Sequence, residues 1–341
     1  MQAERVTVRV GRNRRPRVPV ALVLAVVVGI LLAGCSATGG RPQPNSGGGA
    51  GSGVTTPRIT VAVISHSAPG DTFWDIVRRG AEEAAAKDNI NLLYTAQPEG
   101  AGQAQLVQQA IDQKVSGIAV TLAKPDAMKT VLANAKAANI PVVAINAGAA
   151  SAKELGARAF FGADDRIAGE AVGQKLLDGG YARPICVIHE QGNVGLEERC
   201  AGVKAKIPAT EILYVQGSDM TQVSSTITSK LQATAEADAV IGLGAPYTLT
   251  ALRAVQATGS KAKIASFDLN ADLAQQIKDG KIIFTVDQQP WLQGYLAVEY
   301  FWQQLRGGFE MGGGQPVLTG PAIVDQGNVD AVLKFAQEGI R

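Results

Sequence analysis

The sequence predicts an α/β protein built from two parallel-sheet domains. From Ile59 onward, short apolar runs rich in β-branched residues alternate with segments of helical pattern, which is typical of βαβ units. About five such repeats precede Phe161 and about five follow it, so two domains of similar build are favoured over one sheet. The chain has 341 residues, 46% of them hydrophobic, which is enough for one large or two medium cores.

The first 34 residues predict a secretory signal peptide. Six arginines lie within the first seventeen residues, and an apolar stretch of about 16 residues follows them. That stretch is shorter than the roughly 20 residues that a membrane-spanning helix needs. The residues LAGC, which end at Cys35, resemble the bacterial lipobox, in which the peptide is cut before a cysteine that is then lipidated. An uncleaved anchor helix with an incidental cysteine is the alternative.

Residues 35–57 predict the lipidated cysteine and a flexible tether, because they are rich in glycine, serine and proline. The mature protein is therefore expected outside the cytoplasm, lipid-anchored to the cell membrane. Cysteine usage fits an oxidising compartment, since Cys186 and Cys200 remain as an even pair. They fall on a predicted strand and on the helix after it, where a disulfide is geometrically possible. Two separate buried thiols are the alternative.

The first half of the chain predicts a series of strands and helices in alternation. ITVAVI, INLLYT and SGIAVT each precede a helical pattern, and IPVVAIN closes the set; the helices are expected at about 73–87, 101–114 and 125–138. The residues EEAAAK are strong helix formers, and Pro125 suits the start of a helix, where its missing N–H costs nothing.

The second half repeats this alternation. RAFFGADD precedes a helix expected at about 166–177, and the apolar runs PICVIH, EILYVQ, ADAVIGLG, AKIASFD and KIIFTVD follow, each trailed by a helical pattern.

Polar and aromatic residues stand where the predicted strands end. The first strand is followed by Asp71, Phe73 and Trp74, and later strands end at Asn146, His189, Asp268, Asp287 and Gln288. In open parallel sheets, ligands bind beyond the carboxyl ends of the strands. Because such tips recur in both halves, the sequence predicts a ligand-binding cleft between two domains.

Several functional classes are excluded or disfavoured by the sequence. A net charge of +2 with no basic patch disfavours a nucleic-acid partner. The chain has no GxxxxGK[ST] phosphate loop, no GxSxG elbow and no zinc-binding spacing of cysteine and histidine. With only His66 and His189 available as bases, nothing in the sequence requires catalysis. We therefore expect a non-enzyme without a metal or cofactor.

The order of these features resembles the bacterial periplasmic sugar-binding proteins of the ribose-binding type, the solute-capturing subunits of ABC importers. The aromatic pair, the strand ending in Asn146, and the segments LEERCAGV, SFD and TVDQQP carry this resemblance, which extends from about residue 58 to the C terminus. It implies two doubly wound parallel-sheet domains joined by a three-stranded hinge, the type I periplasmic binding protein fold, which closes on a sugar by hinge motion.

By analogy, the chain crosses between the lobes near Gly162, Gln288 and Leu318. The N-terminal lobe is then expected to comprise residues 58–161 and 289–318, and the C-terminal lobe residues 162–288 and 319–341.

Carried over to this sequence, the family pattern implies a set of ligand contacts. Asp71 is expected to bind a hydroxyl, and Phe73 and Trp74 to stack on the ligand. Further contacts are implied at Asn146, Arg199, Asp268 and Gln288, and Ser65, Met220 and Asn270 are additional candidates. Two alternatives stay open from the residues themselves: Phe73 as a core residue of its helix, and Asp268 as a helix cap.

Three departures from the family pattern weigh against ribose as the ligand. Asn146 and Ala147 stand where the ribose binders use Asp and Arg, Met220 falls near a position that holds an aromatic residue in those proteins, and Gly244 or Ala245 stands in place of an Asn. These departures do not argue against a polyhydroxylated ligand of another kind.

Asp71 and Asp268 facing Arg199 would form a nearly neutral site, which favours a neutral sugar or sugar alcohol over a phosphate or amino acid. The resemblance also implies ABC permease subunits as partners of a monomeric protein. Two other functions remain as alternatives, a ligand-sensing module for a chemoreceptor or sensor kinase and an extracellular carbohydrate-active enzyme. The enzyme would need two carboxylates about 5–9.5 Å apart.

Overall fold

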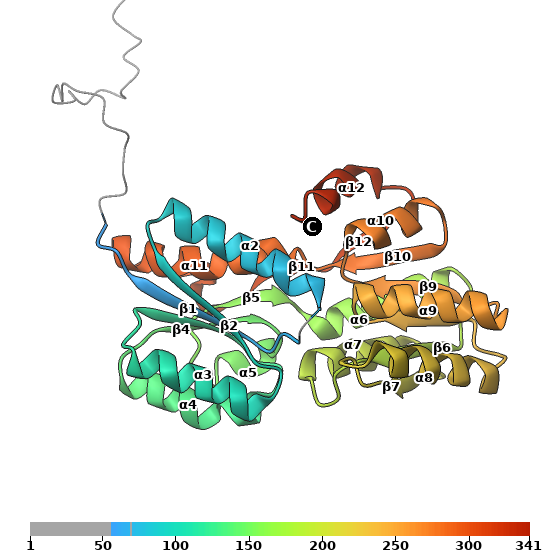
Figure 1. The fold of residues 1–341 in the computed structure, drawn as a ribbon, viewed down its shortest axis with the longest axis horizontal. Coiled ribbons are helices and arrows are strands. Elements are labelled where there is room, and N and C mark those ends of the chain that lie inside the picture. Colours follow the sequence, from blue (N-terminus) through green and yellow to red (C-terminus); the bar gives the residue numbers. More distant parts are fainter. Residues whose placement is uncertain (1–55, 69) are drawn as a thin grey trace, which may run out of the picture. The chain divides into compact units, whose positions relative to one another are not determined.

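The computed structural model describes residues 56–68 and 70–341, which form two α/β lobes (Figure 1). The predicted signal peptide, Cys35 and most of the predicted tether lie outside the described residues. No helix within the described ranges combines the length and the apolar character that a bilayer crossing requires.

The N-terminal lobe contains a six-stranded sheet in the order β11-β5-β4-β3-β1-β2, with every neighbouring pair parallel. Its strands are β1 (Thr60–Ser65), β2 (Asn91–Ala96), β3 (Gly117–Thr121), β4 (Val142–Asn146), β5 (Phe160–Ala163) and β11 (Val317–Gly320). Helices α2 (Thr72–Lys87) and α11 (Pro290–Gly307) pack on one face. Helices α3 (Gly100–Asp112) and α4 (Pro125–Ala137) pack on the other, near the short α5 (Ala149–Ala152), and η1 (Met311–Gly314) precedes β11.

The C-terminal lobe repeats this plan in the order β12-β10-β9-β8-β6-β7, except that β12 is antiparallel to β10. Its strands are β6 (Pro184–Ile188), β7 (Glu211–Tyr214), β8 (Ala239–Gly242), β9 (Lys263–Phe267), β10 (Ile282–Asp287) and β12 (Ala322–Asp325). Helices α6 (Asp165–Asp178) and α7 (Val194–Lys206) cover one face. The other face carries α8 (Met220–Ala233), α9 (Ala245–Thr258), α10 (Ala271–Lys278) and α12 (Asp330–Gln337).

The fold predicted from the sequence, two α/β parallel-sheet lobes, is confirmed. Each of the apolar runs named above forms a strand, and the four helices predicted with bounds occur within two residues of them. Side-chain caps fix the helix starts, because they accept hydrogen bonds from N–H groups that have no partner inside the helix. Asp71 accepts from Phe73 N at 3.1 Å at the start of α2. Other helices are capped in this way by Asp164, Asn193, Asp219 and Asn270.

Cys186 and Cys200 form a disulfide between β6 and α7. The possible disulfide is thus confirmed, and the alternative of two separate thiols is wrong. Because the strand and its following helix belong to the same lobe, the bond secures α7, which carries Arg199, to the sheet.

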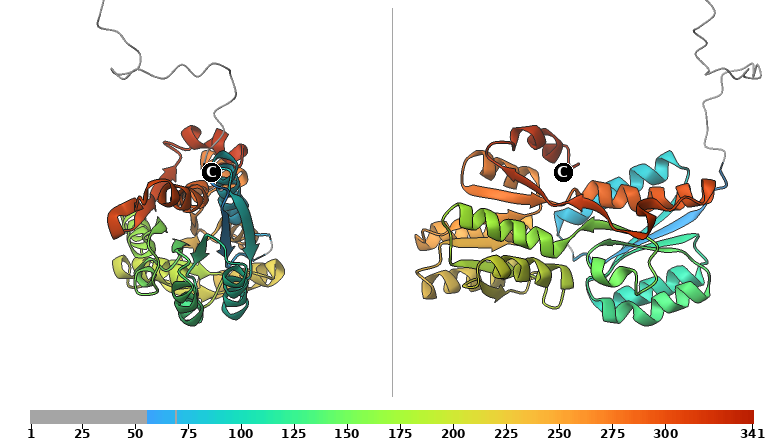
Figure 2. Two further views of the ribbon diagram at one scale, coloured as in Figure 1. Left: turned by 90° about the vertical axis from the view of Figure 1, so that its left-hand side faces the viewer. Right: turned by 180° about the vertical axis from the view of Figure 1, so that it is seen from behind.

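Helices α2 and α11 cross closely, and two glycines permit this approach (Figures 1 and 2). A Cβ atom at Gly294 would lie 1.9 Å from the carbonyl oxygen of Val77, and one at Gly80 would lie 2.0 Å from that of Trp291. No larger side chain fits at either position without moving a helix. The crossing therefore fixes α2, whose first turn carries Phe73 and Trp74.

The chain passes between the lobes three times, between β5 and α6, between β10 and α11, and between β11 and β12. Strand pairing in the N-terminal lobe runs to Ala163 and Gly320. The predicted boundaries at 161 and 318 therefore fall about two residues early, because the length of a strand pairing depends on a partner that a single sequence does not reveal. The second crossing lies between Asp287 and Pro290.

Candidate functional site

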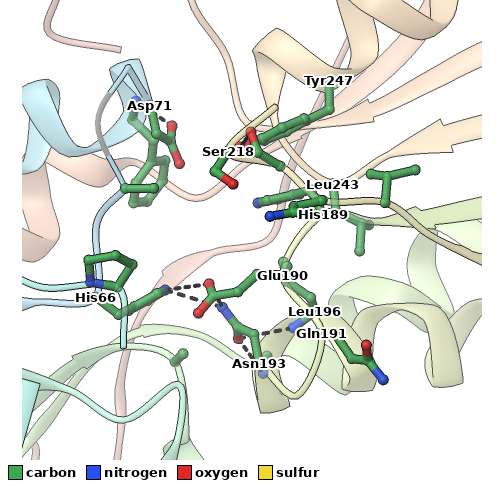
Figure 3. A pocket seen from close by; sticks show the side chains of 18 of the residues that line it. His66, Asp71, His189, Glu190, Gln191, Asn193, Leu196, Ser218, Leu243 and Tyr247 are labelled. Carbon is green, nitrogen blue, oxygen red and sulfur yellow. Dashed lines mark hydrogen bonds and ion pairs between the residues drawn. The ribbon is translucent and has the colours of Figure 1, made fainter. Parts of the chain in front are cut away.

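A cavity of about 580 Å³ lies between the two lobes, at the carboxyl ends of strands from both sheets (Figure 3). This volume is within the range of small-molecule sites, roughly 300–1,000 Å³. The cavity is lined by all seven principal residues that the sequence singled out, namely Asp71, Phe73, Trp74, Asn146, Arg199, Asp268 and Gln288. The structure brings these residues together, and their contact with a ligand stays a prediction.

The three additional candidates do not line this cavity. Ser65 is the fully buried last residue of β1. Met220 is an exposed residue in the first turn of α8. Asn270 caps α10 through Leu273 N at 2.9 Å, which is the role that the sequence left open for Asp268. For these three, nearness in sequence to a strand end did not place the side chain at the cavity.

An aromatic wall from the N-terminal lobe bounds one side of the cavity. The ring centroid of Trp74 lies 5.1 Å from that of Phe73 and 4.9 Å from that of His66, both in T-shaped geometry. Phe73 and Trp74 are each less than 10% exposed and also belong to the core under the sheet. Phe73 is therefore a core residue of its helix, as the alternative held, and its ring also forms part of the cavity wall.

A second wall comes from the C-terminal lobe. His189 directly follows β6, and its ring stacks on Tyr247 of α9 with 3.8 Å between centroids and 14° between planes. Leu243, after β8, lies beside this stack (Figure 3). The sequence marked His189 only as a strand tip and missed Tyr247, which stands one helical turn beyond the strand.

Asn146 and Asp268 occupy equivalent places in the two lobes. Asn146 ends β4 and Asp268 follows β9, and each of these strands is the third from the β11 or β12 edge of its sheet. Both residues have left-handed backbone angles, with φ of 65° and 67°. Asn and Asp tolerate this conformation better than other residues with side chains. The bend turns both side chains out of the strand direction at the cavity.

The charge of Arg199 is balanced mainly by a residue that the sequence did not single out. Its Nε atom donates to Asp165 Oδ1 at 2.8 Å, and both side chains are nearly fully buried. The guanidinium also lies over the ring of Phe267 at 4.8 Å. The expectation that Arg199 is balanced by Asp71 and Asp268 therefore needs correction, because Asp165 is its direct partner.

Burial shifts the protonation of the ionisable groups in the cavity. It raises the pKa of Asp71 to about 6, against the hydrogen bond from Phe73 N, and that of Asp268 to about 7, against the positive charge of Arg199. Burial also lowers the pKa of His189 to about 3 and lowers that of His66. Both imidazoles are therefore neutral at pH 7.

A chain of hydrogen bonds runs from the cavity through the hinge. Asn146 Nδ2 donates to Gln293 Oε1 at 3.3 Å. Gln293 Nε2 donates to Thr319 Oγ1 and to the carbonyl oxygen of Gln288, each at 3.2 Å. Gln288 Nε2 in turn donates to the Asp268 carboxylate. Residues from both lobes and from two crossovers are thus joined in one buried network.

Four side chains form a polar contact between the lobes at one edge of the cavity, which we term the inter-lobe latch (Figure 3). Lys124 Nζ lies 3.2 Å from Glu190 Oε1. Asn193 Nδ2 donates to Glu190 Oε2 at 2.9 Å and lies 3.2 Å from His66 Nε2. The sequence did not predict this latch, although His66 and Glu190 follow strand ends as the predicted residues do.

The acidic and histidine side chains of the cavity do not gather into a metal site. No group of three or more His, Cys, Asp or Glu side chains within residues 56–68 and 70–341 has an arrangement that could hold a metal ion.

Comparison with known proteins identifies the family. Residues 61–308 match the model of the periplasmic binding protein domain. A carbohydrate transporter from Acidothermus cellulolyticus, solved in complex with myo-inositol, is 46% identical with a TM-score of 0.83; the match covers 84% of this chain and 100% of that chain. A solute-binding protein from Agrobacterium vitis with bound D-fucose is 26% identical with a TM-score of 0.73, covering 82% and 99% of the two chains.

Curated relatives agree with this assignment. The ribose import binding protein of Haemophilus influenzae is 29% identical over 70% of this chain and 82% of its own length. That of Bacillus subtilis is 26% identical over 69% and 78%. Proteins of this family act outside the cytoplasm, and these relatives are sugar-binding transport proteins. The chain therefore belongs to the periplasmic binding protein family, as a sugar-binding protein of the ribose-binding type that serves ABC transporters.

Proposed function

We propose that the protein is a lipid-anchored receptor that traps one neutral cyclic polyol or sugar between its lobes and delivers it to an ABC permease. The first candidate ligand is myo-inositol, because the solved relative at 46% identity is a complex with that molecule. The protein binds this ligand without converting it chemically.

The charge balance of the cavity is the observation that carries the proposal. Two cations, Arg199 and Lys124, are each matched by a carboxylate within 3.2 Å. The remaining carboxyls, Asp71 and Asp268, leave no positive charge for an anionic ligand. A phosphate or carboxylate ligand would therefore face like charge, whereas hydroxyl groups satisfy carboxylate, amide and guanidinium groups alike.

The shape of the walls supports a ring as the ligand. A cyclic polyol has C–H surface on its faces and hydroxyl groups around its rim. Aromatic rings from both lobes, Trp74 and Phe73 on one side and the His189–Tyr247 stack on the other, offer apolar contact to such faces. Closure on the ligand is then a hinge motion at the three crossovers.

A thermal-shift screen with myo-inositol, D-ribose, D-arabinose, D-fucose, glycerol and sugar phosphates tests the ligand class. A ligand at one hundred times its dissociation constant stabilises the native state by about 2.7 kcal/mol. We expect a neutral polyol or sugar to raise the melting temperature and sugar phosphates to leave it unchanged. Stabilisation by the phosphates alone, or by none of the compounds, would contradict the proposal.

Calorimetry with the ligand found in the screen tests the site. Trp74→Ala and Asp268→Ala should each weaken binding by at least about tenfold. The first removes the apolar contact of the indole with the ligand, and the second removes a hydrogen bond to a charged group, which contributes roughly 1.5–3 kcal/mol. Trp302→Ala is the matched control, since Trp302 lies on α11 away from the cavity and bonds Thr56. Wild-type affinity in both site variants would refute the assignment of the site.

The lipid anchor rests on the lipobox residues that end at Cys35. Cys35→Ser should release the protein from membrane fractions without changing its affinity for the ligand. Retention of the variant in the membrane would contradict lipidation at this residue.

A further inference from the structure

His189 is held in a fixed orientation by its neighbours. Its ring stacks on Tyr247, and the Tyr247 hydroxyl donates to the Gly217 carbonyl oxygen at 3.4 Å. The Gly217 N–H donates in turn to the His189 carbonyl oxygen at 3.0 Å. Ring and backbone of His189 are thus both tied to the same small group of residues.

Two glycines make room for this stack. A Cβ atom at Gly217 would lie 2.6 Å from the His189 carbonyl oxygen and 2.8 Å from the Tyr247 hydroxyl. A Cβ atom at Gly244 would lie 3.1 Å from the Tyr247 ring. Because any side chain at Gly217 would displace the stack, the local sequence is suited to holding this imidazole at the cavity wall.

The imidazole has hydrogen-bonding capacity that the protein does not use. Among the described residues, the Nδ1 atom of His189 has no hydrogen-bond partner and is shut off from solvent. A buried polar group left without a partner is costly, and native proteins contain few of them. Figure 3 shows the His189 side chain at the edge of the space between the lobes, across from Asp71.

The protonation of His189 defines what it can bind. Because burial lowers its pKa to about 3, the ring is neutral at pH 7, with one nitrogen that donates and one that accepts. A hydroxyl group, which also donates and accepts, matches this ring. A carboxylate or phosphate gains no charge attraction from it.

We propose that His189, positioned by Tyr247 and Gly217, is a specificity-determining residue that hydrogen bonds one ring hydroxyl of the ligand on the side of the C-terminal lobe. This inference rests on the proposed function and assigns a ligand contact beyond the seven residues predicted above. The wall from the C-terminal lobe would then distinguish ligands by the position of a hydroxyl group, in addition to offering apolar contact. A ligand without that hydroxyl leaves the imidazole unpaired and is rejected.

Calorimetry with myo-inositol and its monodeoxy analogues tests the inference on the full mature chain. His189→Phe keeps a ring to stack on Tyr247 and removes both nitrogens, so it should weaken myo-inositol binding by about tenfold. One monodeoxy analogue should bind equally well to wild type and His189→Phe, because it lacks the hydroxyl that the imidazole contacts. His189→Gln, which keeps a donor and an acceptor, should recover part of the affinity for myo-inositol.

Folding is checked on the same samples, and unliganded His189→Phe should melt at or above the wild-type temperature because an unpaired buried polar group is removed. Affinity for myo-inositol within about twofold of wild type would overturn the inference and leave the proposed function intact. An equal loss for every monodeoxy analogue would also overturn it, since that pattern reports a structural effect. If the wild type binds no polyol or sugar, the proposed function and this inference fail together.

Discussion

Replacing Asp268 by asparagine should stabilise the unliganded protein while weakening ligand binding. Asp268 is only 8% exposed, and its side chain accepts a hydrogen bond from Gln288 Nε2. Asparagine has nearly the same shape, tolerates the left-handed backbone at this position, and keeps an oxygen for Gln288. The substitution therefore removes the ionisable group with little change in packing.

The magnitude follows from the pKa of the Asp268 carboxyl. Burial raises it from 3.8 to about 7 in the folded protein. A carboxyl with a raised folded-state pKa contributes its full stability below the unfolded value of 3.8 and loses it as the pH rises to about 7. A difference of about three pH units corresponds to about 4 kcal/mol in the free energy of unfolding. Because asparagine does not ionise, the advantage of Asp268→Asn should grow across this window and reach about 4 kcal/mol at pH 8.

Urea unfolding of the unliganded protein at pH 4, 6 and 8 measures this difference. Asp272→Asn is the matched control, since Asp272 is an exposed residue on the neighbouring helix α10. Its difference from wild type in the free energy of unfolding should not widen between pH 4 and pH 8 as that of Asp268→Asn does. A stability difference for Asp268→Asn that does not widen between pH 4 and pH 8 would refute the reasoning. So would a variant that is less stable than wild type at pH 8.

Two further predictions concern the latch and the disulfide. Lys124→Met and Glu190→Gln should each weaken ligand binding about twofold to fivefold, and the double variant should be no weaker than the poorer single variant, because a partly exposed ion pair contributes about 0.5–1 kcal/mol. Additive losses by calorimetry would show that the two side chains act separately. Replacing Cys186 and Cys200 together by alanine should lower the free energy of unfolding by about 3 kcal/mol, as expected for a closed loop of about 15 residues, and leave affinity unchanged. A loss below about 1 kcal/mol in urea unfolding would contradict this prediction.

Much of the fold was predictable because its signals are local. Alternation of apolar strands with helical patterns needs only neighbouring residues, and the cap at Asp71 lies immediately before its helix. The strand-end rule located Asn146 and Asp268 for the same reason, since the end of an apolar run is visible in the sequence. Asp287 shows the limit of this rule, because it too ends a strand, is fully buried, and does not line the cavity.

The parts that were missed depend on contacts between distant segments. Asp165 pairs with Arg199 across 34 residues, and nothing near Asp165 distinguishes it from Asp164, which caps the same helix. Gln293 joins Asn146 to Thr319 only because the third crossover returns to the hinge. Pairings of this kind are set by how the lobes close, which a single sequence without the fold does not specify.

The cavity concentrates features that are unfavourable for a folded chain taken alone. Asn146 and Asp268 hold left-handed backbones, which cost about 1–3 kcal/mol each. Asp71 and Asp268 are buried carboxyls whose ionisation is opposed by their surroundings, and His189 has a buried nitrogen without a partner. Several such features gather at the cavity, as is common for functional sites. Because ligand hydroxyl groups can hydrogen bond to the carboxyl groups that line the cavity, ligand binding would offset part of a cost that the unliganded protein carries.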